Sequence, residues 1–161
     1  TPIQMAAAYG ALANAGMLIE PRLVERIREQ KSVTTERRRV MSAPVAAQIL
    51  QMLRDVVIEG SGELAAVPGY ETAGKTGTAA KPDPSGGYSD TAYFASFVGI
   101  VPASAPRLVV LVSVDEPQGA IFGGVVAAPA FREIARFALQ YLDVPPDDPA
   151  SLRLDESAPL G

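Results

Sequence analysis

The sequence predicts an α+β fold in which three antiparallel strands pack against helices from both ends of the chain. Both ends carry apolar residues at helical spacing, and the middle carries three runs rich in β-branched and aromatic residues. The last two runs are separated by PASAP, which is short enough for a hairpin and therefore favours antiparallel pairing. The chain has 161 residues, 48% of them hydrophobic, and this is enough to bury a core.

The first element is a helix in TPIQMAAAYGALANAG. Thr1 is placed as its N-cap, Pro2 takes the first helical position, and Gln4 completes a capping box. Gly16 is suited to the left-handed residue that ends such a helix. The segment at residues 21–27 then alternates apolar and charged side chains and predicts a short strand.

Two further helices are predicted from apolar residues that recur at helical spacing. Ser42 caps the first, which continues until the EGSG run at residues 59–62. The second covers residues 128–142. The FGG run at residues 122–124 is expected to turn the chain into this last helix, although its glycines would also suit the floor of a cleft.

The three predicted strands cover residues 70–79, 93–101 and 108–115. A loop rich in Pro, Gly and Ser, KPDPSGGYSD, connects the first strand to the second. After Asp143 the composition changes to VPPDDPASLRLDESAPLG, which is typical of a flexible acidic tail. We therefore divide the chain into a domain at residues 1–146 and a tail at residues 147–161.

The residue types exclude several classes of protein. The chain has no Cys and no His, which excludes cysteine nucleophiles, Ser-His-Asp triads, imidazole bases and most zinc sites. Any catalysis must therefore use Ser, Thr, Lys, Tyr or carboxylates, and no metal is predicted. The net charge of −4 disfavours binding to nucleic acid. The single basic run, Arg37–Arg39, is interpreted as a solvated loop or a strand edge.

The stretch GYETAGKTGT at residues 69–78 has two interpretations. Read from Gly69, it fits the P-loop pattern G-x-x-x-x-G-K-[ST], and Asp115-Glu116 at the end of an apolar strand would be the second nucleotide-binding element. A P-loop requires a helix that begins at its Lys and Thr, because the helix N–H groups hold the phosphates. The residues that follow, GTAAKPDPSGG, contain glycines and two prolines that oppose such a helix.

Read as a strand, Lys75-Thr76-Gly77-Thr78 places Lys75 and Gly77 on one face and Thr76 and Thr78 on the other. A cation beside two hydroxyls can hold a substrate carboxylate. Gly77 leaves room for another segment or an acyl group to lie against the strand. The N–H of Thr78, on a free edge, can stabilise an oxyanion. The sequence favours this strand interpretation over the P-loop.

Several segments, in order, resemble the C-terminal half of a class B penicillin-binding protein transpeptidase domain, especially that of the division-type enzymes. TPIQMAAAYGALANAG resembles the family's T-P-L-Q-L-A-x-A-Y-x-x-L-A-N-G-G helix, and VPGYETAGKTGTAAK resembles its V-A-G-K-T-G-T-A-Q-K strand. YFASFVGIVPASAPRLVVLVSVDEP and FGGVVAAPAFREIARFALQYL resemble the two strands and the final helix that follow.

This resemblance implies a partial serine D,D-peptidase/β-lactamase-like fold. It implies a peptidoglycan D,D-transpeptidase that cross-links stem peptides by serine acyl transfer, binds penicillin and uses no cofactor. Lys75, Thr76, Gly77 and Thr78 would bind the carboxylate of a D-Ala-D-Ala terminus or of a β-lactam, and the Thr78 amide would form half of the oxyanion hole. The parent would act in the periplasm, anchored by a membrane helix outside this chain, with a glycan polymerase and division proteins as partners.

The family's two other motifs are not found in this sequence. No Ser is followed by Lys three positions later or by Asn two positions later, as Ser-x-x-Lys and Ser-x-Asn require. We therefore expect the N-terminal strands and the nucleophile helix to lie outside this chain, and the chain alone to be inactive. The alternatives are a β-lactamase or D,D-carboxypeptidase, a non-catalytic penicillin-recognising or scaffolding module, and a P-loop NTPase.

Overall fold

The central sheet of the computed structural model contains β3 (Ala73–Pro82), β4 (Tyr88–Val101) and β5 (Leu108–Asp115), in that order. Both neighbouring pairs are antiparallel, as predicted, and β5 has the predicted bounds. The structure describes residues 1–22 and 35–155. The loop between β3 and β4 is shorter than predicted, because the ladder continues as far as the Pro82–Tyr88 pair.

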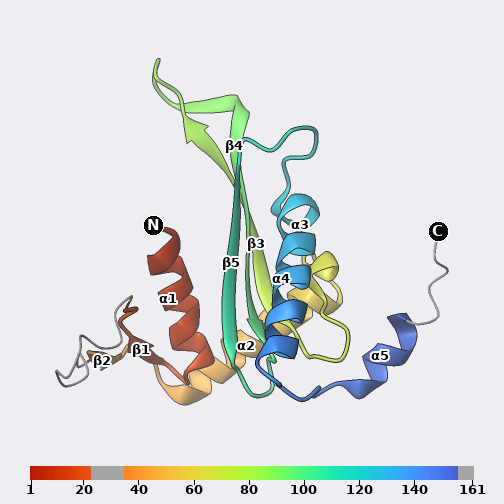
Figure 1. Ribbon diagram of the computed structural model, residues 1–161. Coiled ribbons are helices and arrows are strands. Elements are labelled where there is room, and N and C mark those ends of the chain that lie inside the picture. Colours follow the sequence, from red (N-terminus) through yellow and green to blue (C-terminus); the bar gives the residue numbers. More distant parts are fainter. Residues whose placement is uncertain (23–34, 156–161) are drawn as a thin grey trace, which may run out of the picture.

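Helices cover both faces of the sheet (Figure 1). Phe97 and Ile100 of β4 point to opposite faces, since three positions separate them along the strand. On the Phe97 face lie the short helix η1 (Glu63–Ala65), α3 (Gly123–Val126) and α4 (Ala128–Tyr141). On the Ile100 face lies α1 (Pro2–Ala13), together with Leu53 of α2 (Ala43–Ile58).

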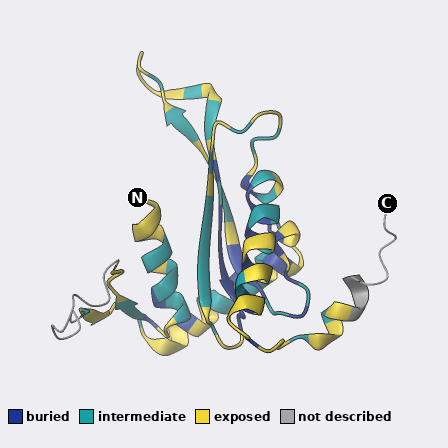
Figure 2. Ribbon diagram, in the orientation of Figure 1, coloured by how far each residue is buried: buried dark blue, intermediate teal, exposed yellow. Residues whose placement is uncertain are grey.

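The main core lies between β4 and α4, where buried residues concentrate in Figure 2. Phe97 of β4 and Phe131 of α4 are fully buried, and their ring centroids are 4.9 Å apart at an interplanar angle of 56°. Each buried ring contributes about 1.5–3 kcal/mol relative to an exposed one. This contact fixes α4, and with it α3, against the face of the sheet that carries Phe97.

The N-terminal region confirms two predictions. The Gln4 side-chain oxygen accepts hydrogen bonds from the N-terminal amine and the hydroxyl of Thr1, each at 2.9 Å. Gly16 is left-handed with φ +84°, as predicted, but the left-handed conformation after α1 already begins at Ala15, with φ +50°. The basic run forms β2 (Arg37–Arg39), an exposed strand paired with β1 (Met17–Ile19). The strand predicted at residues 21–27 is not seen at its first two residues, and its remainder lies outside the described residues.

The segment after α4 packs back against the residues that precede β3. Val144 is buried, and the N–H of Asp148 donates to the carbonyl oxygen of Gly69 at 3.0 Å. Helix α5 (Pro149–Asp155) follows, and its Ser151 hydroxyl accepts a hydrogen bond from the Gly69 N–H at 2.8 Å.

The described part of the predicted flexible tail, residues 147–155, is therefore docked. Its polar groups find backbone partners up to 82 positions away in the sequence, which composition alone does not indicate. Residues 156–161, the rest of that prediction, lie outside the described residues. Across the described ranges, no helix combines the length and the apolar character that crossing a bilayer requires.

Candidate functional site

Lys75-Thr76-Gly77-Thr78 lies in the middle of β3, and each of the four residues is paired in register with β4. The strand interpretation of GKTGT is thereby confirmed. The P-loop alternative is wrong, because the chain stays extended from Ala73 to Pro82 and provides no helix N-terminus at Thr76. Within the described residues β3 is an edge of the sheet, so one side of its backbone is not covered by another strand.

The side chains of this strand separate as predicted. Thr76 and Thr78 both line one cleft, whereas a Cβ built at Gly77 would point to the other face and lie 2.6 Å from the Ser96 hydroxyl. The Lys75 ammonium bends toward its neighbour and donates to the Thr76 carbonyl oxygen at 3.3 Å and to the Thr76 hydroxyl at 3.2 Å. The positive charge of Lys75 therefore meets the Thr76 hydroxyl at this edge, and Thr78 lines the same cleft as Thr76.

The cleft beside these threonines has a volume of about 340 Å³. Its floor comes from α3, where a Cβ at Gly123 or Gly124 would overlap the carbonyl oxygen of Ser96 or Ser61, respectively. The Gly123 N–H donates to the Thr78 hydroxyl at 3.3 Å. The FGG run thus lines the cleft, which the sequence suggested only as an alternative to a simple turn into the last helix. The other lining residues are Gly60, Ser61, Glu63, Leu64, Phe122 and Val125.

Sequence reasoning did not identify Ser61 as a functional residue. Its hydroxyl lies 2.9 Å from the Thr76 hydroxyl, although 15 positions separate the two residues in the chain. The Gly-Ser-Gly turn after α2 was interpreted as a helix end, and this is what it forms. The available signal was a small polar residue between two glycines, which is common in turns and does not indicate a site by itself.

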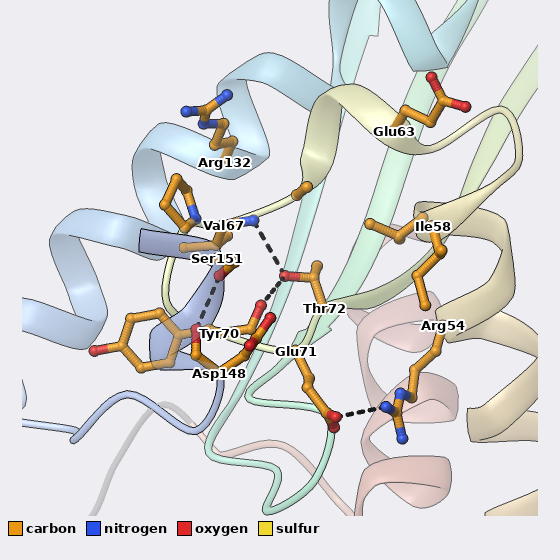
Figure 3. A pocket seen from close by; sticks show the side chains of 13 residues that line it. Arg54, Ile58, Glu63, Val67, Tyr70, Glu71, Thr72, Arg132, Asp148 and Ser151 are labelled. Atoms are coloured by element: carbon orange, nitrogen blue, oxygen red, sulfur yellow. Dashed lines mark hydrogen bonds and ion pairs between the residues drawn. The ribbon is translucent and has the colours of Figure 1, made fainter. Parts of the chain in front are cut away.

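A larger pocket, of about 590 Å³, lies between α2, η1 and the segment before β3 (Figure 3). In this pocket Arg54 forms an ion pair with Glu71 at 2.5 Å, and the Thr72 hydroxyl donates to the backbone carbonyl oxygen of Tyr70 at 3.3 Å. None of the four motif residues lines this pocket. We therefore assign the candidate site to the smaller cleft, on its chemistry.

The β3 side of the cleft presents groups that suit an anion, with the Lys75 ammonium beside the lining residue Thr76, whereas the Glu63 carboxylate on η1 also lines the cleft. A cation, hydroxyls and the backbone of an edge strand together can hold a carboxylate and can stabilise negative charge that develops next to it. In residues 1–22 and 35–155, no three His, Cys, Asp or Glu side chains are grouped so that they could hold a metal ion.

Residues 1–136 match the sequence model of the family described as "Penicillin binding protein transpeptidase domain". The chain belongs to this family. The penicillin-binding transpeptidase relationship that the sequence segments indicated is confirmed, as is the mixed fold with a three-stranded antiparallel sheet.

Individual relatives agree with this assignment. Penicillin-binding protein PbpB of Mycolicibacterium smegmatis is 42% identical over 160 residues, which cover 90% of this chain and 25% of the relative. A probable peptidoglycan D,D-transpeptidase PbpC of Pseudomonas aeruginosa is 42% identical over 147 residues, which cover 90% of this chain and 25% of the relative. This penicillin-binding transpeptidase chain thus spans about a quarter of the length of the curated relatives it matches.

A solved structure gives the same result for the fold. Penicillin-binding protein 3 of Mycobacterium tuberculosis, complexed with ampicillin, matches with a TM-score of 0.80 and 37% identity. The match covers 91% of this chain and 36% of that chain. The elements described above, including β3 with its Lys-Thr-Gly-Thr motif, therefore belong to a penicillin-binding transpeptidase fold.

Proposed function

We propose that this chain is the C-terminal part of a peptidoglycan D,D-transpeptidase, and that β3 provides its carboxylate-binding edge. The observation that carries the proposal is the convergence of the Lys75 ammonium and the Thr76 hydroxyl, 3.2 Å apart, beside the cleft that Thr78 also lines. A stem peptide that ends in D-Ala-D-Ala, or a β-lactam, carries the carboxylate that such a site recognises. The ampicillin bound to the M. tuberculosis relative supports the same substrate class.

Each motif residue has a proposed role. Lys75, Thr76 and Thr78 bind the substrate carboxylate through charge-assisted hydrogen bonds. Gly77 leaves the strand bare, so that the acyl part of the substrate lies against it. The Thr78 N–H donates to the carbonyl oxygen as it becomes an oxyanion, and an edge strand suits this because alternate N–H groups point away from the sheet.

The reaction requires a serine nucleophile that a part of the protein outside these 161 residues would supply. Its Oγ attacks the carbonyl carbon between the two D-alanines, the terminal D-Ala leaves with a proton on its amine, and an acyl ester remains. The amine of a neighbouring stem peptide then attacks the ester, forms the cross-link and returns the proton to the serine. This chemistry takes place at the cell wall, so we place the protein on the extracytoplasmic face, beside a glycan polymerase and division proteins.

Covalent labelling of the complete gene product with a fluorescent penicillin tests this function. We expect wild-type protein to form a stable adduct, and Lys75→Ala to lower the acylation rate about 10- to 100-fold, since it removes a charged donor. Lys81→Ala is the matched control, because Lys81 lies on the same strand and is paired with Asp115 and Glu116 instead. Wild-type protein that forms no adduct contradicts the proposal.

A second measurement separates transfer from hydrolysis. With a stem-peptide donor and an amine acceptor, a transpeptidase yields a cross-linked product whose amount rises with acceptor concentration. A β-lactamase or carboxypeptidase would release only the hydrolysed donor at every acceptor concentration. Adduct formation without either product would indicate a penicillin-recognising module.

A further inference from the structure

Ser61 lies in the turn after α2, and its side chain reaches the motif strand from outside the motif. Its Oγ is 2.9 Å from the Oγ1 of Thr76, and both residues line the same cleft. We propose that Ser61 is a positioning residue of the carboxylate site, which directs the Thr76 O–H toward the substrate. This inference rests on the function proposed above and adds a residue that lies 14 positions before Lys75 in the sequence.

The Thr76 hydroxyl can make only a limited number of hydrogen bonds. A hydroxyl has one hydrogen to donate and two lone pairs that accept. The Lys75 ammonium donates to Thr76 Oγ1 at 3.2 Å, which fills one lone pair. If Ser61 donates as well, both lone pairs are filled, and the single Thr76 hydrogen is left for a carboxylate in the cleft.

A bound carboxylate selects this direction of the Ser61–Thr76 hydrogen bond. An ionised carboxylate accepts only, so the Thr76 hydrogen is stabilised when it points to the ligand. Ser61 must then donate to Thr76. Without the Ser61 hydroxyl, the Thr76 O–H has a second lone pair open to water and loses part of its orientation before the substrate binds.

The backbone around Ser61 is held in place on both sides. The Gly62 N–H donates to the Val56 carbonyl oxygen at 3.0 Å, which ties the turn to the end of α2. On the other side the Ser61 carbonyl oxygen lies so close to Gly124 that a Cβ there would overlap it. The residue itself is exposed, so its hydroxyl can be removed at little cost to folding.

The experiment compares acylation of the complete gene product by benzylpenicillin and by the methyl ester of benzylpenicillin, which lacks the carboxylate. We expect Ser61→Ala to lower the second-order rate constant about tenfold with the acid and less than about twofold with the ester, relative to wild type. Ser61→Thr, which keeps a hydroxyl, should restore the rate with the acid to within about threefold. Ser42→Ala is the matched control, because Ser42 lies at the other end of α2 and makes no side-chain cap hydrogen bond.

A double-mutant cycle tests whether Ser61 acts through Thr76. In a Thr76→Val background, Ser61→Ala should change the rate with the acid by less than about twofold, since the hydroxyl that it orients is gone. Equal losses with acid and ester, additive losses in the cycle, or an unchanged Ser61→Ala variant would each overturn this inference and leave the proposed function intact. A wild-type protein that forms no adduct would overturn both.

Discussion

The Tyr70 hydroxyl donates a hydrogen bond to the carbonyl oxygen of Val144 at 2.6 Å, across 74 positions of sequence. Val144 is buried, and Tyr70 lies three residues before the start of β3. The contact therefore connects the segment after α4 with the segment that leads into the motif strand. This hydrogen bond therefore helps to hold the start of β3, the strand that carries Lys75 and Thr78.

We predict an alkaline loss of stability that depends on Tyr70. Burial, and the negative charge of Asp147, raise the pKa of Tyr70 above its usual value of about 10. The folded protein holds this proton more tightly than the unfolded chain, so the stabilisation is complete below pH 10 and is lost as the pH rises through the folded-state pKa.

Tyr70→Phe isolates this contribution. Because it removes one hydrogen bond, the free energy of unfolding should fall by about 1 kcal/mol at pH 7. Urea denaturation of both proteins from pH 7 to pH 11 should show this difference shrinking above pH 10. The comparison excludes Tyr9, whose pKa is also raised by burial, since both proteins contain it. A difference that stays constant up to pH 11 would contradict the prediction.

The Asp147 carboxylate is predicted to hold the start of β3. It accepts a hydrogen bond from the Glu71 N–H at 2.9 Å, and its other oxygen accepts one from the Ser104 hydroxyl. Asp147→Ala should lower the free energy of unfolding by about 1–2 kcal/mol and speed hydrogen exchange at the Glu71 amide. Asp90→Ala, at an exposed carboxylate on β4, is the control and should leave the Glu71 exchange rate unchanged.

Alanine at Gly74 and alanine at Gly77, both in β3, should lower the stability of the protein by different amounts. A Cβ at Gly74 would overlap the buried Phe97 ring, whereas a Cβ at Gly77 would meet the Ser96 hydroxyl at 2.6 Å. A packed ring cannot move away, but a serine hydroxyl can rotate. We expect Gly74→Ala to cost about 1–3 kcal/mol of stability and Gly77→Ala less than about 1 kcal/mol.

Chemical denaturation measures the free energy of unfolding of the Gly74→Ala and Gly77→Ala variants. Penicillin acylation is the second readout. In the complete gene product, Gly77→Ala should slow acylation while the protein stays folded, since the added methyl group occupies the bare face of β3 on which the acyl part of the substrate is proposed to lie. Adding Ser96→Ala to Gly77→Ala should recover the lost stability but not the lost acylation. Equal losses of stability in the two single variants would show that the Phe97 contact is not what requires Gly74.

Much of the fold was predictable because its signals are local. The β-branched residues at 108–115 predict a strand with the bounds that the structure has. The capping box at Thr1 and Gln4 places the start of α1. The glycine and prolines after Thr76 opposed a helix there, and the strand at Ala73–Pro82 agrees with them.

The cleft was less predictable, because contacts between distant residues form it. The Ser61 hydroxyl contacts the Thr76 hydroxyl, and the Gly123 N–H donates to the Thr78 hydroxyl, although Gly123 lies 45 positions after Thr78 in the chain. Ser61 has an ordinary local role in a turn, which does not indicate a site. The sequence predicts Gly123 as part of a turn into the last helix and offers the floor of a cleft only as the alternative. The docked residues 147–155 were assigned to a tail for the same reason, since Pro and Asp are common in flexible segments and their partners lie before β3.

The sequence by itself determined that Lys75-Thr76-Gly77-Thr78 is extended and that its cation and hydroxyls occur together, because strand alternation is a property of the local backbone. Only the tertiary structure decided which groups face these hydroxyls. Close packing of α3 and of the turn after α2 against β3 brings Ser61, Gly123 and Gly124 to the cleft. That packing depends on the Phe97–Phe131 contact and on backbone approaches that have no signature in any single segment.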